Sequence, residues 1–160
     1  MPEPTGCLGL LAKLLGFGGG RGKGPPPLPL PYAVTDRFLS PAELSFYQVL
    51  RSILSPEVVI CPKVRLADVL YTRRPHENQR ARNRLSQKHV DFLICDAATM
   101  TPRLVIELDD ASHQRADRQE RDAWVDAALR AAGLPILHIK AARSYVPAEL
   151  QRIIQAGVSG

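Results

Sequence analysis

Long hydrophobic runs are missing from this chain of 160 residues. No segment reaches the ~20 consecutive apolar residues that a membrane-spanning helix needs, so we expect no stable membrane span. A short apolar run over residues 7–17 is broken by two glycines and a lysine and lacks a basic leader, which argues against a cleaved signal peptide. Leu8, Leu11 and Leu15 could share one helical face, so contact with a membrane surface and contact with a protein partner both stay open for this tail.

Cysteine is equally scarce, because the chain contains only Cys7, Cys61 and Cys95. Their odd number and wide spacing exclude a disulfide framework and a CxxC motif. Both features favour a reducing compartment, so we expect a cytoplasmic protein. We expect Cys61 and Cys95 to be small buried residues in strands.

Acidic residues are outnumbered by basic ones, 16 against 21, and the formal net charge is +5. Such a balance permits DNA as a partner without requiring it. Much of the excess lies in residues 71–89, where Glu77 is the only acid. The basic residues of this segment are Arg73, Arg74, Arg80, Arg82, Arg84 and Lys88. Two interpretations stay open, a solvated insertion loop and an arm that contacts phosphates.

Composition divides the chain into an N-terminal tail, residues 1–36, and a domain, residues 37–160. Three glycines at positions 18–20 predict a flexible stretch, and the proline-rich run over residues 25–31 favours a stiff polyproline II segment. We interpret the two together as a spacer, with a ligand for a proline-binding module as the alternative.

Helix and strand signals fill the domain. Ser40 can cap a helix in which Pro41 takes the first position and Glu43 completes a capping box. Pro62 predicts an edge position or a bulge in the first strand. The expected elements are a helix from Pro41 that Pro56 closes, strands over 58–64, 89–95 and 103–109, a helix over 117–132 that Gly133 ends, a strand over 134–139 and a helix over 147–156. The second and third strands are close enough in sequence to predict an antiparallel hairpin, and in the helix over 117–132 we expect Trp124, Ala127, Ala128 and Ala131 to pack inward.

Carboxylates gather at the ends of two of these strands. Glu107 and Asp109 follow the apolar run Leu104-Val105-Ile106, and Asp91 interrupts the apolar run of the strand before it. Because side chains alternate along a strand, Glu107 and Asp109 point to one face. A cation, an Arg or Lys partner or a divalent metal could offset their charge. Two acids on neighbouring strands suffice to hold Mg²⁺ or Mn²⁺, whereas Asp91 could also bond simply to a backbone N–H.

The order of these motifs resembles the PD-(D/E)xK restriction-endonuclease-like superfamily. Within it, the motifs resemble a bacterial family known as domain of unknown function 2726 and the relatives of very-short-patch-repair endonucleases. The residues that carry the resemblance are His89 to Phe92, Ile106 to Asp110, His113, Asp117, Arg121-Asp122 and Ala132 to Pro135. The resemblance implies an α/β fold with an αβββαβ core, in which a mixed four-stranded sheet is flanked by helices.

The resemblance also implies roles for individual residues. Asp91 and Glu107 would bind the metal, with Glu43 as a further candidate beside its capping role. Asp109 stands where the superfamily has a lysine, and it could become a third metal ligand or pair with Arg118 or Arg121. His113 is the leading substitute for that lysine, ahead of Lys88 and Lys63. Arg121 and Lys88 would support the phosphate or the carboxylates.

The function expected from this resemblance is a metal-dependent nuclease that hydrolyses phosphodiester bonds of DNA. Asp91, Glu107, Asp109 and His113 form its expected catalytic set, and Mg²⁺ or Mn²⁺ its cofactor. The alternative is a catalytically inactive nucleic-acid-binding or interaction domain of the same fold. The missing lysine at position 109 is the main support for that alternative.

Overall fold

A computed structural model describes residues 30–109 and 116–159, with the backbone alone for 116–122 and for 158–159. The chain divides into two compact units, Met1–Asp36 and Arg37–Gly160. In the first unit, residues 30–36 are described, and all are exposed. The apolar run and the spacer predicted within residues 1–29 lie outside the described residues.

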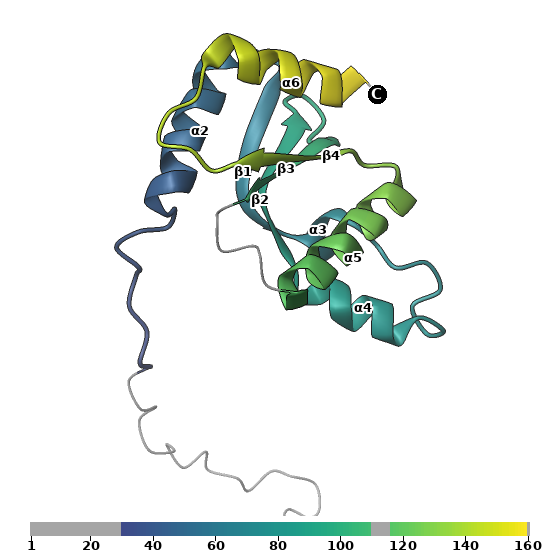
Figure 1. The fold of residues 1–160 in the computed structure, drawn as a ribbon. Coiled ribbons are helices and arrows are strands. Elements are labelled where there is room, and N and C mark those ends of the chain that lie inside the picture. Colours follow the sequence, from purple (N-terminus) through teal and green to yellow (C-terminus); the bar gives the residue numbers. More distant parts are fainter. Residues whose placement is uncertain (1–29, 110–115, 160) are drawn as a thin grey trace, which may run out of the picture. The chain divides into compact units, whose positions relative to one another are not determined.

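A four-stranded mixed sheet forms the centre of the second unit (Figure 1). Its strands follow the order β1-β2-β3-β4. Strands β1 and β2, and likewise β2 and β3, pair antiparallel, whereas β3 and β4 are parallel. The predicted hairpin between the second and third strands is therefore confirmed. The strands are β1 (Val58–Arg65), β2 (His89–Asp96), β3 (Pro102–Asp109) and β4 (Ile136–Lys140).

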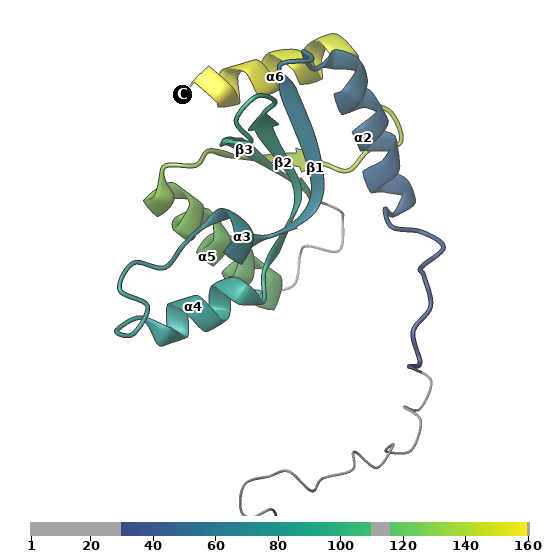
Figure 2. The same ribbon diagram turned by 180° about the vertical axis from the view of Figure 1, so that it is seen from behind.

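Helices cover both faces of this sheet, as Figures 1 and 2 show from opposite sides. The helices α2 (Pro41–Ile53) and α6 (Pro147–Ser159) lie on one face; α3 (Leu66–Val69), α4 (Gln79–Ser86) and α5 (Ala116–Ala132) lie on the other. The unit is thus a mixed α/β fold with an open sheet flanked by helices. No helix in the part of the chain that the structure describes combines the length and the hydropathy needed to span a bilayer.

The core on the α2 and α6 face is built around aromatic rings. Phe46 of α2 is fully buried, and its ring lies 5.5 Å from that of Phe92 and 5.0 Å from that of Tyr145. Leu50 of α2 and Ile154 of α6 complete this core. Burial of these large side chains holds both helices to the sheet, because each buried side chain stabilises the fold by about 1.5–3 kcal/mol.

Helix α2 begins as the sequence predicts. The Ser40 Oγ accepts a hydrogen bond from the Glu43 N–H at 3.3 Å, and the Glu43 carboxylate accepts one from the Ser40 N–H at 2.6 Å. The capping box is therefore confirmed, and it fixes the position of Glu43 at the helix start.

The turn between β2 and β3 is held by the carboxylate of Asp96. This carboxylate accepts hydrogen bonds from the Thr99 hydroxyl and backbone N–H, from the Ala98 N–H and from the Arg103 guanidinium. The hydrogen bonds from Thr99, followed by that from Arg103, lower the pKa of Asp96. A fixed turn sets the register of the hairpin, and with it the position of every side chain on β3.

Two features of the second face differ from expectation. Residues 66–88 form two helices between β1 and β2, and Leu66 and Leu85 of these helices are buried. In α5 the most deeply buried residues are Val125 and Leu129. Of the residues predicted to pack inward, Trp124 packs against this core and Ala128 is partly buried, whereas Ala127 and Ala131 are exposed. The predicted inward face was therefore wrong in part. The sheet selects the helical face with the larger apolar side chains, because they bury more apolar area than alanine does.

The prediction for Gly133 is confirmed, and that for the two strand cysteines is confirmed only for one. Gly133 ends α5 with a φ of +74°, as predicted for a glycine at a helix C-terminus. Cys95 is buried, whereas Cys61 is only partly buried. Burial, together with the neighbouring Cys61, raises the pKa of the Cys95 thiol to about 11, so this thiol stays protonated and inert at neutral pH.

The substitution Phe46→Ala should lower the free energy of unfolding by roughly 3–5 kcal/mol, because it opens a cavity between α2 and the sheet. The matched control is Leu44→Ala on the same helix, where the side chain is 45% exposed and the change should stay within about 1 kcal/mol. Urea denaturation measures both values. Equal midpoints for the two variants would contradict this account of the core.

Candidate active site

The carboxylate of Asp91 ends the ladder between β2 and β3. Phe92 pairs with Ile106, so in the same register Asp91 and Glu107 occupy the next position along the two strands. The Asp91 Oδ2 accepts a hydrogen bond at 2.8 Å from the backbone N–H of Leu108. The Val105 N–H points to β4, and N–H groups alternate along a strand, so the Leu108 N–H points to β2. The Asp91 side chain therefore accepts the hydrogen bond that, in a continuing ladder, the Leu108 N–H would donate to a backbone carbonyl of β2.

Glu107 and Asp109 lie on the face that α5 covers. Val105 belongs to the core under α5, whereas Ile106 and Leu108 belong to the core under α2 and α6. Alternation along β3 then puts Glu107 and Asp109 on the same side as Val105. The structure thus brings both acids to the end of the strand at which the ladder opens.

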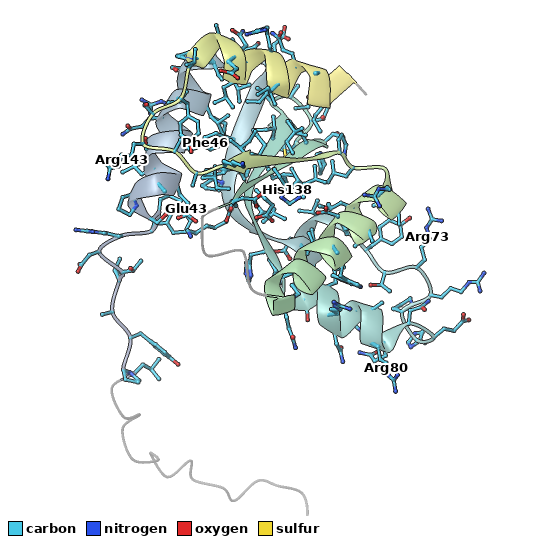
Figure 3. All side chains as sticks on the ribbon, in the orientation of Figure 1. Glu43, Phe46, Arg73, Arg80, His138 and Arg143 are labelled. Atoms are coloured by element: carbon cyan, nitrogen blue, oxygen red, sulfur yellow. The ribbon has the colours of Figure 1, made fainter. Side chains whose placement is uncertain are left out.

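His138 joins two carboxylates on this face. It lies opposite Glu107 in the parallel pairing of β3 and β4. Its Nδ1 is 3.3 Å from the Asp109 Oδ1, and its Nε2 is 3.1 Å from the Asp126 Oδ1. Figure 3 shows His138 on β4, between the sheet and α5. Because an ionised carboxylate only accepts hydrogen bonds, both ring nitrogens must donate, and the geometry suits an imidazolium ion.

The pKa of His138 is raised above the ordinary value for histidine. Burial is the largest single influence and by itself lowers this pKa. The hydrogen bonds to Asp126 and Asp109, together with the charges of these carboxylates, outweigh the burial. His138 therefore carries a positive charge over a wider pH range than a free histidine.

Glu43 has a second partner besides its helix cap. The Lys63 Nζ lies 2.8 Å from the Glu43 Oε1. Burial raises the pKa of Glu43, but hydrogen bonds from Lys63 and from the Ser40 backbone more than compensate, so the pKa is lowered overall. Lys63, proposed as a substitute for the missing lysine, is thus bound to an acid from α2.

The register aligns charged residues from all four strands. Pro62 pairs with Phe92 and Val64 with Val90, so Lys63 stands opposite Asp91. Continuing across the sheet, Asp91 is level with Glu107, and Glu107 is paired with His138. Lys63 has a φ of +54°, which is uncommon for a lysine and marks a kink in β1 at this level. The Lys63 ammonium reaches Glu43 of α2, on the α2 and α6 face, whereas His138 lies with Glu107 and Asp109 on the α5 face.

Sequence reasoning missed two cations of β4. His138 and Lys140 are the residues paired with Glu107 and Asp109. The alternation of residues 136–140 could have indicated them. Leu137 and Ile139 pack under α2 and α6, so His138 and Lys140 are left on the α5 face. The sequence could not show which residues of β3 they meet, because nothing local sets the register of a parallel pair.

The remaining predicted residues are placed only in part. His113 lies outside the described residues. Arg121 belongs to α5, but its side chain lies outside what the structure describes. Lys88 directly precedes β2, and its backbone carbonyl accepts a hydrogen bond from the Leu66 N–H at 2.8 Å.

A metal ion at this place would rely on few protein ligands. Among the described side chains, no three His, Cys, Asp or Glu residues form a group that could hold a metal ion. Asp91 and Glu107 still offer carboxylate oxygens at one level of neighbouring strands. This donor set fits Mg²⁺, because Mg²⁺ prefers oxygen, takes one or two carboxylates and keeps several waters.

The fold and the site together define a class of protein, a mixed α/β domain with carboxylates at the ends of neighbouring strands. Residues 35–157 match the model of a family described as Protein of unknown function (DUF2726), and the chain belongs to this family. No curated protein matches the chain. No solved structure matches it.

The pH dependence of stability tests the His138 cluster. A raised pKa in the folded state means that the stabilising contribution of His138 is complete below its unfolded pKa of about 6.5 and is lost as the pH rises through the folded pKa. In metal-free buffer, the melting temperature of the wild type should exceed that of His138→Gln most at acidic pH, and the difference should shrink above about pH 6.5.

The control for this pH trend removes the partners and keeps the histidine. In the double variant Asp109→Asn, Asp126→Asn, a further His138→Gln substitution should produce little of the trend, because the carboxylates cause the shift. A melting-temperature difference that stays constant with pH in the wild-type background would show that His138 is not charged by these neighbours.

Proposed function

We propose that this chain is a metal-dependent nuclease that hydrolyses phosphodiester bonds of DNA on a restriction-endonuclease-like αβββαβ core. The observation that supports it best is the register that puts Asp91 level with Glu107 where the β2–β3 ladder ends. The element order supports it as well, since α2, the three strands, α5 and β4 follow the order of that core.

In this proposal Asp91 and Glu107 hold Mg²⁺ or Mn²⁺, and Asp109 assists from the same face. The metal ion supplies Lewis-acid chemistry, by neutralising phosphate charge and lowering the pKa of a bound water. The bond from the Leu108 N–H fixes one oxygen of Asp91, and a carboxylate can accept on the other as well. Asp91 is thereby oriented before any ligand arrives, which reduces the entropy lost on binding.

The positive charge that the superfamily takes from lysine comes, in this proposal, from β4. His138 is held as a cation between Asp109 and Asp126, and Lys140 is paired with Asp109 along the strands. These groups would stabilise negative charge that develops on the phosphate. His113 remains the proposed general base or acid, because it directly follows these strands in sequence.

The arginine-rich segment supplies the contact to DNA. Arg73, Arg80, Arg82 and Arg84 lie in or next to α4 and are exposed. Figure 3 shows Arg73 and Arg80 pointing outward from this part of the second unit. Exposed guanidinium groups bind phosphates without reading bases, so the proposal includes no sequence specificity from this segment.

The substitution Glu107→Gln should abolish cutting while preserving the fold. Removing one of two metal-holding carboxylates should slow cleavage of plasmid and linear DNA, in Mg²⁺ or Mn²⁺, by roughly 100-fold or more. Glu149→Gln in α6, on the other face of the sheet, is the matched control and should cut like the wild type. Wild-type rates in Glu107→Gln, at equal folding, would refute the proposed active site.

A second candidate function is a catalytically inactive nucleic-acid-binding domain of the same fold. It is favoured by the partners that Asp91 and Asp109 already have, a backbone N–H and His138. In that case the acids are a structural cluster, and a divalent metal adds nothing to stability.

The melting temperature in Mn²⁺ separates the two candidates. A nuclease should be stabilised by Mn²⁺, because a ligand that binds only the folded state at 100 times its Kd adds about 2.7 kcal/mol. Glu107→Gln should lose this stabilisation. If Mn²⁺ leaves the wild type unchanged and Glu107→Gln melts well below it, the structural cluster is the correct interpretation.

A further inference from the structure

A cleft of about 370 Å³ lies between α4, α5 and the segment that joins α3 to α4. It is separate from the carboxylate cluster, since none of its lining residues belongs to that cluster. The volume is in the range of small-molecule sites, ~300–1,000 Å³. The residues that the argument uses are Tyr71, Arg73, Leu85, Trp124, Ala128 and Ala131, all of which line the cleft.

Most of the side chains that line this cleft are apolar. Ala128 and Ala131 form the α5 side, and Leu85 forms the α4 side. The aromatic rings of Tyr71 and Trp124 also line the cleft. Tyr71 is 82% exposed, so its ring is accessible to a ligand from solvent. The small side chains of the two alanines leave a slot beside the aromatic rings, and this slot suits a planar ligand.

The rim of the cleft is cationic. Arg73 itself lines the cleft, and the Arg84 guanidinium stacks over Trp124 at 4.5 Å from the ring centre. Glu77, the one acid in the sequence of this segment, is paired with Arg74 at 3.4 Å. The positive charge on the rim therefore favours an anionic ligand, and the slot favours a ligand with a planar apolar group.

We propose that this cleft binds an unpaired nucleotide of a DNA strand, with the base in the slot and its phosphate on Arg73. A nucleotide combines a planar ring with an adjacent negative charge, and base–aromatic stacking with a basic groove is how proteins hold single strands. A base inside a duplex presents no free face, so only a single-stranded or unpaired nucleotide can enter. The choice of DNA as the polymer rests on the proposed nuclease function; the cleft's preference for an unpaired base does not.

Fluorescence tests the proposal directly, because Trp124 is the only tryptophan of the chain. Excitation at a wavelength that tyrosine does not absorb reports on this ring alone. In EDTA, a single-stranded oligonucleotide should quench Trp124, because the base would take the place of the Arg84 guanidinium over this ring. A blunt duplex and inorganic polyphosphate should not quench it. Equal quenching by polyphosphate would show a purely ionic surface and overturn the proposal.

Two leucine substitutions on α5 separate the cleft from the rest of the helix. Ala131→Leu fills the slot and should weaken binding of the single strand roughly tenfold, as expected for the loss of a base stack. Ala123→Leu is the matched control, because Ala123 is exposed on the same helix and does not line the cleft. Fluorescence anisotropy of a labelled oligonucleotide measures both. Equal affinities for the two variants would overturn the proposal.

Arg73 has its own matched control in Arg143, which Figure 3 shows far from α4, on the loop that follows β4. Arg73→Gln should make the slope of log affinity against log salt less steep by roughly 0.7 for a single strand, one phosphate contact. Arg143→Gln should leave the slope unchanged. Identical slopes in both variants would contradict the phosphate contact.

These binding measurements test the cleft proposal separately from the nuclease proposal. Binding is measured in EDTA, where no metal-dependent cutting occurs. If quenching and the Ala131→Leu effect are present but no DNA form is cut in Mn²⁺, the cleft proposal stands and the nuclease proposal fails. If DNA is cut but Ala131→Leu binds and cuts like Ala123→Leu, the cleft proposal is wrong.

Discussion

The hydrogen bond from the Leu108 N–H to the Asp91 carboxylate decides where the sheet opens. A backbone N–H that loses its strand partner costs free energy unless another acceptor replaces it, and Asp91 is that acceptor. The strands can therefore part at the level of Glu107 without leaving a donor unsatisfied. The same residue ends the ladder and presents a charge at the opening, so the strand geometry and the chemistry of the site have one cause.

Helix α5 connects the parts of the second face. Its Val125 and Leu129 close the core, its Asp126 fixes His138, and its alanines line the cleft. Three faces of one helix thus meet three environments, because a helix distributes neighbouring residues around its axis at 100° steps. A shift of α5 along the sheet would alter the charge on His138 and the width of the cleft together.

Local sequence signals predicted much of the fold, but they could not predict how segments distant in sequence pair with one another. The capping box at Ser40, the hairpin of β2 and β3 and the end of α5 at Gly133 each follow from a few adjacent residues. The inward face of α5 was wrong in part: Trp124 packs against the core as predicted, but Val125 and Leu129 rather than the alanines are buried there, because the sheet selects the larger side chains. Of the candidate site, Asp91 and Glu107 were visible as acids in apolar strands, but His138 was not, since only the β3–β4 register gives it a role. The interpretation of residues 71–89 as a solvated loop is correct in part, because the arginines of α4 are exposed but Leu85 of the same helix is buried in the core.

The segment 66–88 enters and leaves the sheet at one place, because Arg65 and His89 are paired across β1 and β2. Both ends of the insertion are therefore anchored by the sheet rather than by the insertion itself. The segment could be lengthened, shortened or given a different charge while the strands and their acids stay where they are, provided that other side chains cover the α5 face where Leu66 and Leu85 now pack. Such changes would alter the surface around α4 without rebuilding the sheet.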